Sequence, residues 1–157
     1  MSNLPTENVQ NYPRPPALEQ VSHRLLVRLG GQVAADTNQG YRVLETHHAP
    51  TYYFPPIDVL ARLEPASGRS LCEWKGLAGY FDVICGTANA RRAAWVFEEP
   101  STAFQAIAGY VAFYAGPMEA CFVGDEQVIP QPGDFYGGWV TSNLRGVPKG
   151  ARGTEHW

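Results

Sequence analysis

Lysine is scarce in this chain of 157 residues, which has two lysines beside ten arginines. An excess of positive charge is also lacking, because twelve basic residues stand against fifteen acidic ones, for a formal charge of -3. Proteins that bind the phosphate backbone of nucleic acids usually carry such an excess. We therefore expect no nucleic acid partner.

Paired cysteines are lacking as well. The three cysteines are far apart and form no C-x-x-C pair, so the sequence does not support a zinc ribbon or a thioredoxin-like redox site. A free cysteine packs as a small apolar residue. We expect three reduced thiols, no metal and no cofactor.

Long apolar runs and phosphate-binding loops are the remaining absences. Residues 1–7 have neither a basic nor an apolar signal region, and no later run reaches bilayer length. No G-x-x-x-x-G-K-S/T or G-x-G-x-x-G loop occurs. The sequence therefore predicts a cytoplasmic protein with no membrane partner.

Short alternating runs separated by turn residues dominate the rest of the chain. Runs at 24–29 and 32–35 flank Gly30-Gly31, and glycine reaches the positive φ angles of tight hairpin turns. Further strands are predicted at 41–45, 52–54, 70–74, 80–85, 90–97, 110–114 and 119–123, the last two as a closing hairpin over Gly116-Pro117. This pattern is typical of a mainly β fold.

Two short helices complete the prediction. The first is expected at 57–62, because Pro55-Pro56 suits a helix start and Glu64-Pro65 suits its end. The second is expected at 102–108, where alanines favour a helix and Ser101 is placed to cap it.

The chain has the length of a single small domain. Residues 1–20 hold four prolines among polar residues and predict an extended arm, and residues 127–157 predict a Gly/Pro-rich tail packed on or extending from the body. The β-rich core is expected at 21–126.

The candidate site begins at the end of the predicted strand 41–45. If the strand continues, Glu45 and His47 share one face, which favours His47 over His48 as the imidazole that Glu45 orients. Tyr52 and Tyr53 point to opposite faces, so one of them lines a pocket, and the pattern does not decide which. Solvent-facing loop histidines are the alternative.

Lys75 stands between Trp74 and Gly76. Lysine is a compact cation, so a lysine in a pocket suits binding an anion or acting as a base. The alternative is an exposed lysine whose stem lies on the indole ring of Trp74. Asp58 is expected in the first turn of the first helix, where the helix dipole favours a carboxylate.

Several motifs in order resemble one bacterial family. They are Glu45-Thr-His47, Pro50, Tyr52-Tyr53-Phe54-Pro55, Asp58-Val59, Cys72-Glu-Trp-Lys75-Gly76 with Tyr80, Ala93-Ala-Trp95, Pro100 and Ile107-Ala-Gly-Tyr-Val-Ala-Phe-Tyr114. Together they resemble the family called domain of unknown function 427, also labelled nucleotidyltransferase-like, over about residues 21–126. The resemblance implies a small β-rich domain with a curled, tent-like antiparallel sheet, and it adds Tyr80 and Tyr114 to the pocket.

Three functional hypotheses remain open on the sequence. The first is a pocket that binds a small anionic ligand. The second is a small enzyme for nucleotidyl transfer or hydrolysis that uses Lys75 with Glu45 and His47. The third is a structural module that binds a partner through the arm and the tail. The sequence does not decide between binding and turnover, and it leaves the ligand and the oligomeric state open.

Overall fold

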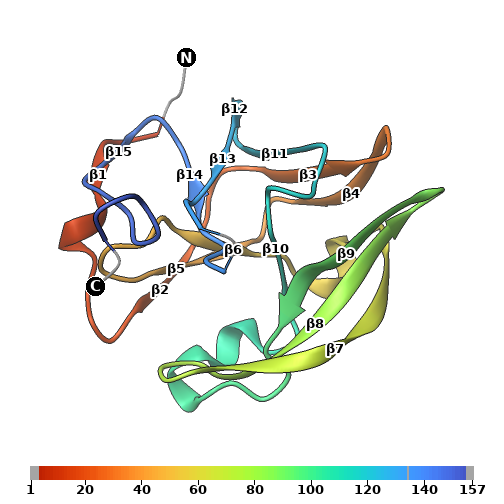
Figure 1. The fold of residues 1–157 in the computed structure, drawn as a ribbon, viewed down its shortest axis with the longest axis horizontal. Coiled ribbons are helices and arrows are strands. Elements are labelled where there is room, and N and C mark those ends of the chain that lie inside the picture. The colour runs from red at the N-terminus through yellow and green to blue at the C-terminus, as the bar shows by residue number, and fades with distance from the viewer. Residues whose placement is uncertain (1–3, 134, 155–157) are drawn as a thin grey trace.

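The structure is a computed structural model that describes residues 4–133 and 135–154 (Figure 1). The strands are β1 (Glu7–Asn8), β2 (Ala17–Gln20), β3 (Leu25–Leu29), β4 (Gln32–Thr37), β5 (Tyr41–Leu44), β6 (Thr51–Tyr53), β7 (Arg62–Cys72), β8 (Gly76–Cys85), β9 (Ala88–Val96), β10 (Val111–Phe113), β11 (Ala120–Val123), β12 (Glu126–Gln127), β13 (Ile129–Pro130), β14 (Trp139–Val140) and β15 (Leu144–Arg145). The helical segments are all 3₁₀: η1 (Val9–Asn11), η2 (Pro56–Asp58) and η3 (Thr102–Ile107). The predicted mainly β fold is confirmed.

The strands are distributed over several sheets. Two of these have four strands, in the orders β10-β9-β8-β7 and β12-β11-β3-β4, and a third has the order β2-β5-β6. Two further sheets have two strands each. The pair of β1 with β15 connects the two ends of the chain, and the pair of β13 with β14 lies within its last part. Among the described strands, each pairing is antiparallel except that of β1 with β15.

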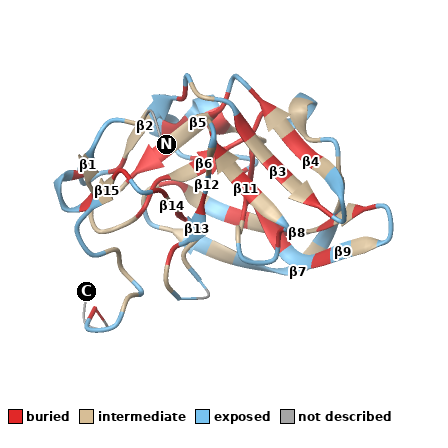
Figure 2. Cartoon of the chain, turned by 90° about the horizontal axis from the view of Figure 1, so that it is seen from above, coloured by how far each residue is buried: buried red, intermediate tan, exposed pale blue. Residues whose placement is uncertain are grey.

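The β3–β4 hairpin forms where the glycine pair predicted it. Gly30 and Gly31 have φ angles of 62° and 76°, which residues with a Cβ rarely adopt. Leu25, Val27 and Leu29 are buried and alternate with partly exposed residues, as the alternating colours along β3 show (Figure 2). One face of this hairpin therefore belongs to the core.

The predicted hairpin of residues 110–114 with 119–123 is wrong. β10 pairs with β9, whereas β11 pairs with β3 and β12, so the two neighbours in sequence lie in different sheets. All three residues of β10 are buried, which a half-exposed hairpin strand does not allow. The burial of β10 decides its partner, and the local turn residues do not.

The predicted helices are shorter and tighter than expected. The first is limited to the single turn of η2, and Pro65 lies inside β7 at the edge of its sheet, where a proline displaces no ladder partner. The second is the 3₁₀ segment η3, and Ser101 does not cap it. The Ser101 hydroxyl donates instead to the Trp74 carbonyl, 2.7 Å away.

The buried side chains form two main clusters. The first fills the space among β3, β4, β8, β9, β10 and β11, and Leu25, Val27, Val83 and Phe113 are each fully buried in it. The second, with Tyr53, Trp95, Phe97, Phe104 and Ile107, lies beside η3. Since β9 and β10 contribute to both clusters, they form the wall between them.

The segments at both ends of the chain pack against the body. Arg42 on β5 forms ion pairs with Glu7, at 2.9 Å, and Glu19, at 2.7 Å. The buried indole of Trp139 donates to the Phe113 carbonyl at 3.0 Å. The division of the chain at residues 20 and 126 stays a prediction. Among the described residues, no helix has the length and apolar character needed to cross a membrane.

Candidate functional site

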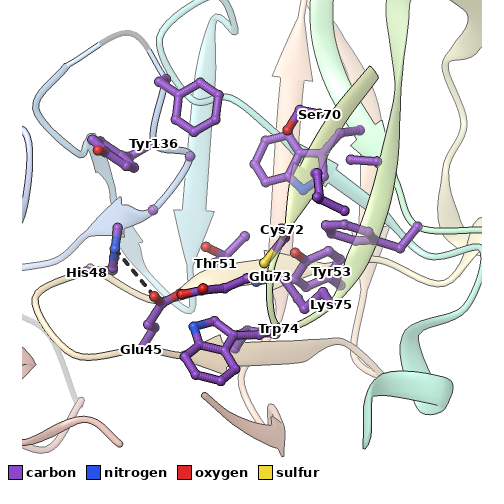
Figure 3. A pocket seen from close by; sticks show the side chains of 18 of the residues that line it. Glu45, His48, Thr51, Tyr53, Ser70, Cys72, Glu73, Trp74, Lys75 and Tyr136 are labelled. Carbon is purple, nitrogen blue, oxygen red and sulfur yellow. Dashed lines mark ion pairs between the residues drawn. The ribbon is translucent and has the colours of Figure 1, made fainter. Parts of the chain in front are cut away.

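A cleft of about 360 Å³ opens beside the second cluster. Its walls come from the end of β5, from β6, from the tip of the β7–β8 hairpin and from residues 135–149 (Figure 3). Five of the residues predicted for the site line it: Glu45, Tyr53, Lys75, Tyr80 and Tyr114. The cleft therefore brings together side chains that are up to 69 positions apart, Glu45 to Tyr114.

The tip of the β7–β8 hairpin is held in place by Ser101. The Ser101 backbone N–H donates to the Lys75 carbonyl at 2.9 Å, and its hydroxyl donates to the Trp74 carbonyl. Gly76 has a φ of 113°, a conformation that residues with a Cβ rarely adopt. Gly76 thus turns the chain at Lys75, and Ser101 fixes the turn.

Lys75 is largely buried, with 9% of its surface exposed. Its ammonium lies 5.7 Å from the centre of the Phe97 ring and 5.8 Å from that of Phe104, within the range of cation–π attraction. Within residues 4–133 and 135–154, no carboxylate forms an ion pair with it. A desolvated cation in an apolar setting is costly unless an anion compensates it.

Tyr53 is the tyrosine that lines the cleft, while Tyr52 points to the opposite face and packs against Trp139. The Tyr53 side chain is 1% exposed, and its hydroxyl donates no hydrogen bond to a described residue. Burial raises the pKa of Tyr53, so the phenol keeps its proton at neutral pH. It is a hydrogen-bond donor that lacks an acceptor within the described chain.

His48, and not His47, lies at the cleft beside Glu45. β5 ends at Leu44, and the N–H of His48 closes a turn onto the Glu45 carbonyl at 3.0 Å, so the assumed alternation stops. His47 has a φ of 68° within this turn. The Nε2 atom of His48 lies 3.9 Å from the Glu45 carboxylate, and the two side chains face each other (Figure 3).

The buried side chain of Gln131 determines which nitrogen of His48 carries the proton. Its Oε1 accepts from the Ala49 N–H at 3.1 Å, and its Nε2 donates to the Lys149 carbonyl at 2.8 Å. These backbone groups fix the orientation of the amide, since one only donates and the other only accepts. The same Nε2 faces Nδ1 of His48 at 3.2 Å, so Nδ1 is the acceptor and Nε2 carries the proton.

The charges around His48 favour the same neutral state. Burial, and then the charges of Lys149 and Lys75, lower the pKa of His48 to about 4. A protonated ring would also turn Nδ1 into a donor against Gln131. At neutral pH His48 therefore presents an N–H donor, and no basic nitrogen, to the side of the cleft where Glu45 lies.

Aromatic side chains form the far wall. The rings of Trp95 and Tyr114 lie 4.6 Å apart, and the Tyr114 hydroxyl donates to the Phe135 carbonyl at 3.0 Å. Burial, followed by the neighbouring Tyr80, raises the pKa of Tyr114. Gly137 lies so close to the Trp95 ring that a Cβ there would fall 2.0 Å from it. The segment after residue 134 is thereby packed directly on the site.

The sequence reasoning missed the residues that come from the last part of the chain. These are Gln131, Phe135, Tyr136 and Lys149. One signal was available: Lys149 is the second of the two lysines, and both line this cleft. The Nζ atom of Lys149 lies 5.6 Å from the centre of the Tyr136 ring.

The three cysteines and Asp58 take different positions relative to the cleft. Cys72 lines the cleft, while Cys85 and Cys121 are buried elsewhere, and all three are free. Asp58 lies outside the cleft in η2 and accepts from the Thr37 hydroxyl at 2.7 Å. Within the described ranges, no group of three or more His, Cys, Asp or Glu side chains is arranged to hold a metal ion.

Comparison with known proteins supplies a family. Residues 17–124 match a family model named NTP_transf_9, whose description is "Domain of unknown function (DUF427)". A search of curated proteins found no match. The matched range contains Glu45, Tyr53 and Lys75, and it ends before Phe135, Tyr136 and Lys149, which also line the cleft.

Proposed function

Because the chain belongs to the DUF427 family, whose description names no activity, we propose its function from the cleft: it binds a small organic anion there. The observation that carries this proposal is Lys75, a largely buried cation in a cleft with no carboxylate partner among the described residues. A bound carboxylate or phosphate would supply the missing charge.

Two neutral donors support the same ligand class. The Tyr53 hydroxyl donates to no described residue, and the Nε2–H of His48 lies 3.9 Å from the Glu45 carboxylate, too far for a hydrogen bond; both lie at the cleft. Together with the ammonium of Lys75 they offer an anion three donors of different geometry. The cleft has the volume of small-molecule sites, and its aromatic walls favour a ligand with a flat apolar part.

The same geometry favours binding over proton transfer through His48. A general base needs a free lone pair toward the substrate, and the free nitrogen of His48 accepts from Gln131 instead. Glu45 remains an acceptor at the cleft and suits a hydroxyl or amino group of the ligand. Nucleotidyl transfer or hydrolysis would have to rely on other ionisable groups of the cleft, among them Glu45, Glu73 and Lys75.

The test is a screen of aromatic and aliphatic carboxylates and phosphate esters at constant ionic strength, read as melting temperature and followed by calorimetric titration. We expect at least one anion to raise the melting temperature saturably, because a ligand that binds only the folded state stabilises it. Lys75→Met should weaken the binding of this anion by about 10- to 100-fold, as expected for the loss of a hydrogen bond to a charged group.

Arg91→Gln is the matched control. Arg91 is an exposed cation that lines no described cavity, so its loss changes the net charge equally and should leave the affinity unchanged. Equal binding to Lys75→Met and to the unmodified protein would contradict the proposal. A screen in which no anion binds would favour the structural module instead.

A further inference from the structure

A second cavity of about 640 Å³ adjoins the cleft. The two share one wall, which includes Ser70, Tyr80, Tyr114 and Tyr136. The two cavities therefore adjoin along these aromatic rings, and we refer to the pair as the groove. A ligand longer than the cleft would extend along this shared wall.

Two arginines, Arg69 and Arg92, line the second cavity. Neither forms an ion pair with a carboxylate in the described part of the chain, although Arg24, Arg42 and Arg62 all do. The cavity lining, so far as it is described, contains no acidic side chain. The described lining of the second cavity thus carries two exposed arginines and no carboxylate, in a protein of formal charge -3.

The backbone at Arg92 adopts an unusual conformation. Its φ is 48°, which is uncommon for a residue other than glycine. The β8–β9 register shifts between Phe81 and Val83, so Asp82 lies opposite a bulge, and the Asp82 carboxylate accepts from the Arg92 N–H at 2.8 Å. Bulges of this kind redirect a side chain and are frequent beside functional sites.

The Arg92 guanidinium is positioned by two neighbours. It lies 4.0 Å from the centre of the Tyr80 ring, and its Nε donates to the Ser67 carbonyl at 3.2 Å. The terminal Nη groups make no hydrogen bond to a described residue. A planar fork that is fixed on one side and open on the other is suited to two parallel hydrogen bonds with an oxyanion.

We propose that the second cavity is a phosphate subsite, in which Arg69 and Arg92 bind a phosphoryl group at the far end of the organic anion held by Lys75. Two arginines with several free donors match the charge and the three terminal oxygens of a phosphate ester better than a single carboxylate. This inference rests on the proposed function, and it narrows the ligand class to phosphorylated organic acids with a flat middle part.

The subsite is tested with inorganic phosphate alone, followed through the side-chain Nε–Hε NMR signals of the arginines. Phosphate should shift the signals of Arg69 and Arg92 saturably. Arg92→Gln and Arg69→Gln should each weaken binding at least about tenfold, Arg92→Lys should weaken it less, and the neighbouring Arg91→Gln should leave it unchanged. Circular dichroism confirms that each variant is folded.

The outcomes separate this inference from the proposed function. Lys75→Met should leave the phosphate-induced shifts at Arg92 intact, while it weakens the binding of organic anions. Absence of saturable shifts at Arg92, or equal weakening by Arg91→Gln, overturns the phosphate subsite and leaves the anion cleft standing. Failure of organic anions to bind, with phosphate still shifting Arg92, overturns the proposed function instead.

Whether one ligand occupies both cavities is tested by comparing the affinity for 4-carboxyphenyl phosphate with that for benzoate. If one ligand occupies both cavities, the phosphate ester should bind at least about tenfold more tightly than benzoate, and Arg92→Gln should remove this advantage. An advantage that survives Arg92→Gln, or no advantage in the unmodified protein, would overturn the shared ligand.

Discussion

The two buried clusters share β6, β8, β9 and β10 and differ in what they bury. The cluster around Leu25 and Phe113 is made of apolar side chains that pack against one another. The cluster around Tyr53 and Trp95 opens into a cleft and buries a phenol hydroxyl that donates to no described residue. The first contributes stability, whereas the buried polar groups of the second cost some of it, which the proposed ligand would restore.

The largest expected effect is a loss of stability when a ring is removed from the cluster around Leu25 and Phe113, which we call the closed cluster. Phe113 is fully buried and meets Phe54 edge to face, with 5.3 Å between the ring centres. Phe113→Ala should lower the free energy of unfolding by about 3–5 kcal/mol, because it removes buried apolar surface and leaves a cavity. Urea denaturation measures this, and a loss below about 1 kcal/mol would mean that the closed cluster is not tightly packed.

The second largest expected effect is a pH dependence of the free energy of unfolding that arises from His48 at the cleft. The pKa of His48 in the folded protein is about 4, below its ordinary 6.5, so the unfolded chain takes up the proton first as the pH falls. The stability contributed by neutral His48 is complete above pH 6.5 and is lost as the pH falls toward 4. The shift corresponds to about 3 kcal/mol.

His48→Gln provides the comparison for this effect. The variant should lose less stability between pH 7 and pH 4 than the unmodified protein, since glutamine does not titrate. An NMR titration of the His48 ring should also show the Nε2–H tautomer and a midpoint near pH 4. A midpoint near 6.5, or equal acid sensitivity of the two proteins, would show that Gln131 does not hold the ring neutral.

The smallest effect has the opposite sign. Tyr53→Phe removes a buried hydroxyl that donates to no described residue, so it should raise the free energy of unfolding by up to about 1 kcal/mol while it weakens anion binding. Tyr52→Phe is the matched control, because Tyr52 is also buried but lies on the other face of β6. A loss of stability in Tyr53→Phe would show that the hydroxyl already has a partner.

Local patterns predicted the parts of the fold that local chemistry controls. The Gly30-Gly31 turn joins β3 and β4 as expected, because positive φ at adjacent residues is a local requirement. The partners of β10 and β11 depend on which face each strand buries across the whole molecule, so the proximity of the strands in sequence misled the prediction.

The candidate site shows the same limit. Lys75 was singled out by its rarity and its neighbours, and the cleft includes it. The choice of His47 depended on a strand that continues past Leu44, and a turn replaces that strand. The role of Gln131 could not be predicted from the sequence, because its effect on His48 requires two segments 83 positions apart to meet.

Part of the cleft wall lies outside the range that the family match covers. Lys75 and Tyr53 sit on strands within residues 17–124, whereas Phe135, Tyr136 and Lys149 follow that range. The proposed anion site is thus assembled from a range that the family model describes and from a later segment that it does not describe. Differences in that later segment would change which molecule fits the proposed site, while Lys75 and Tyr53 stay within the matched range.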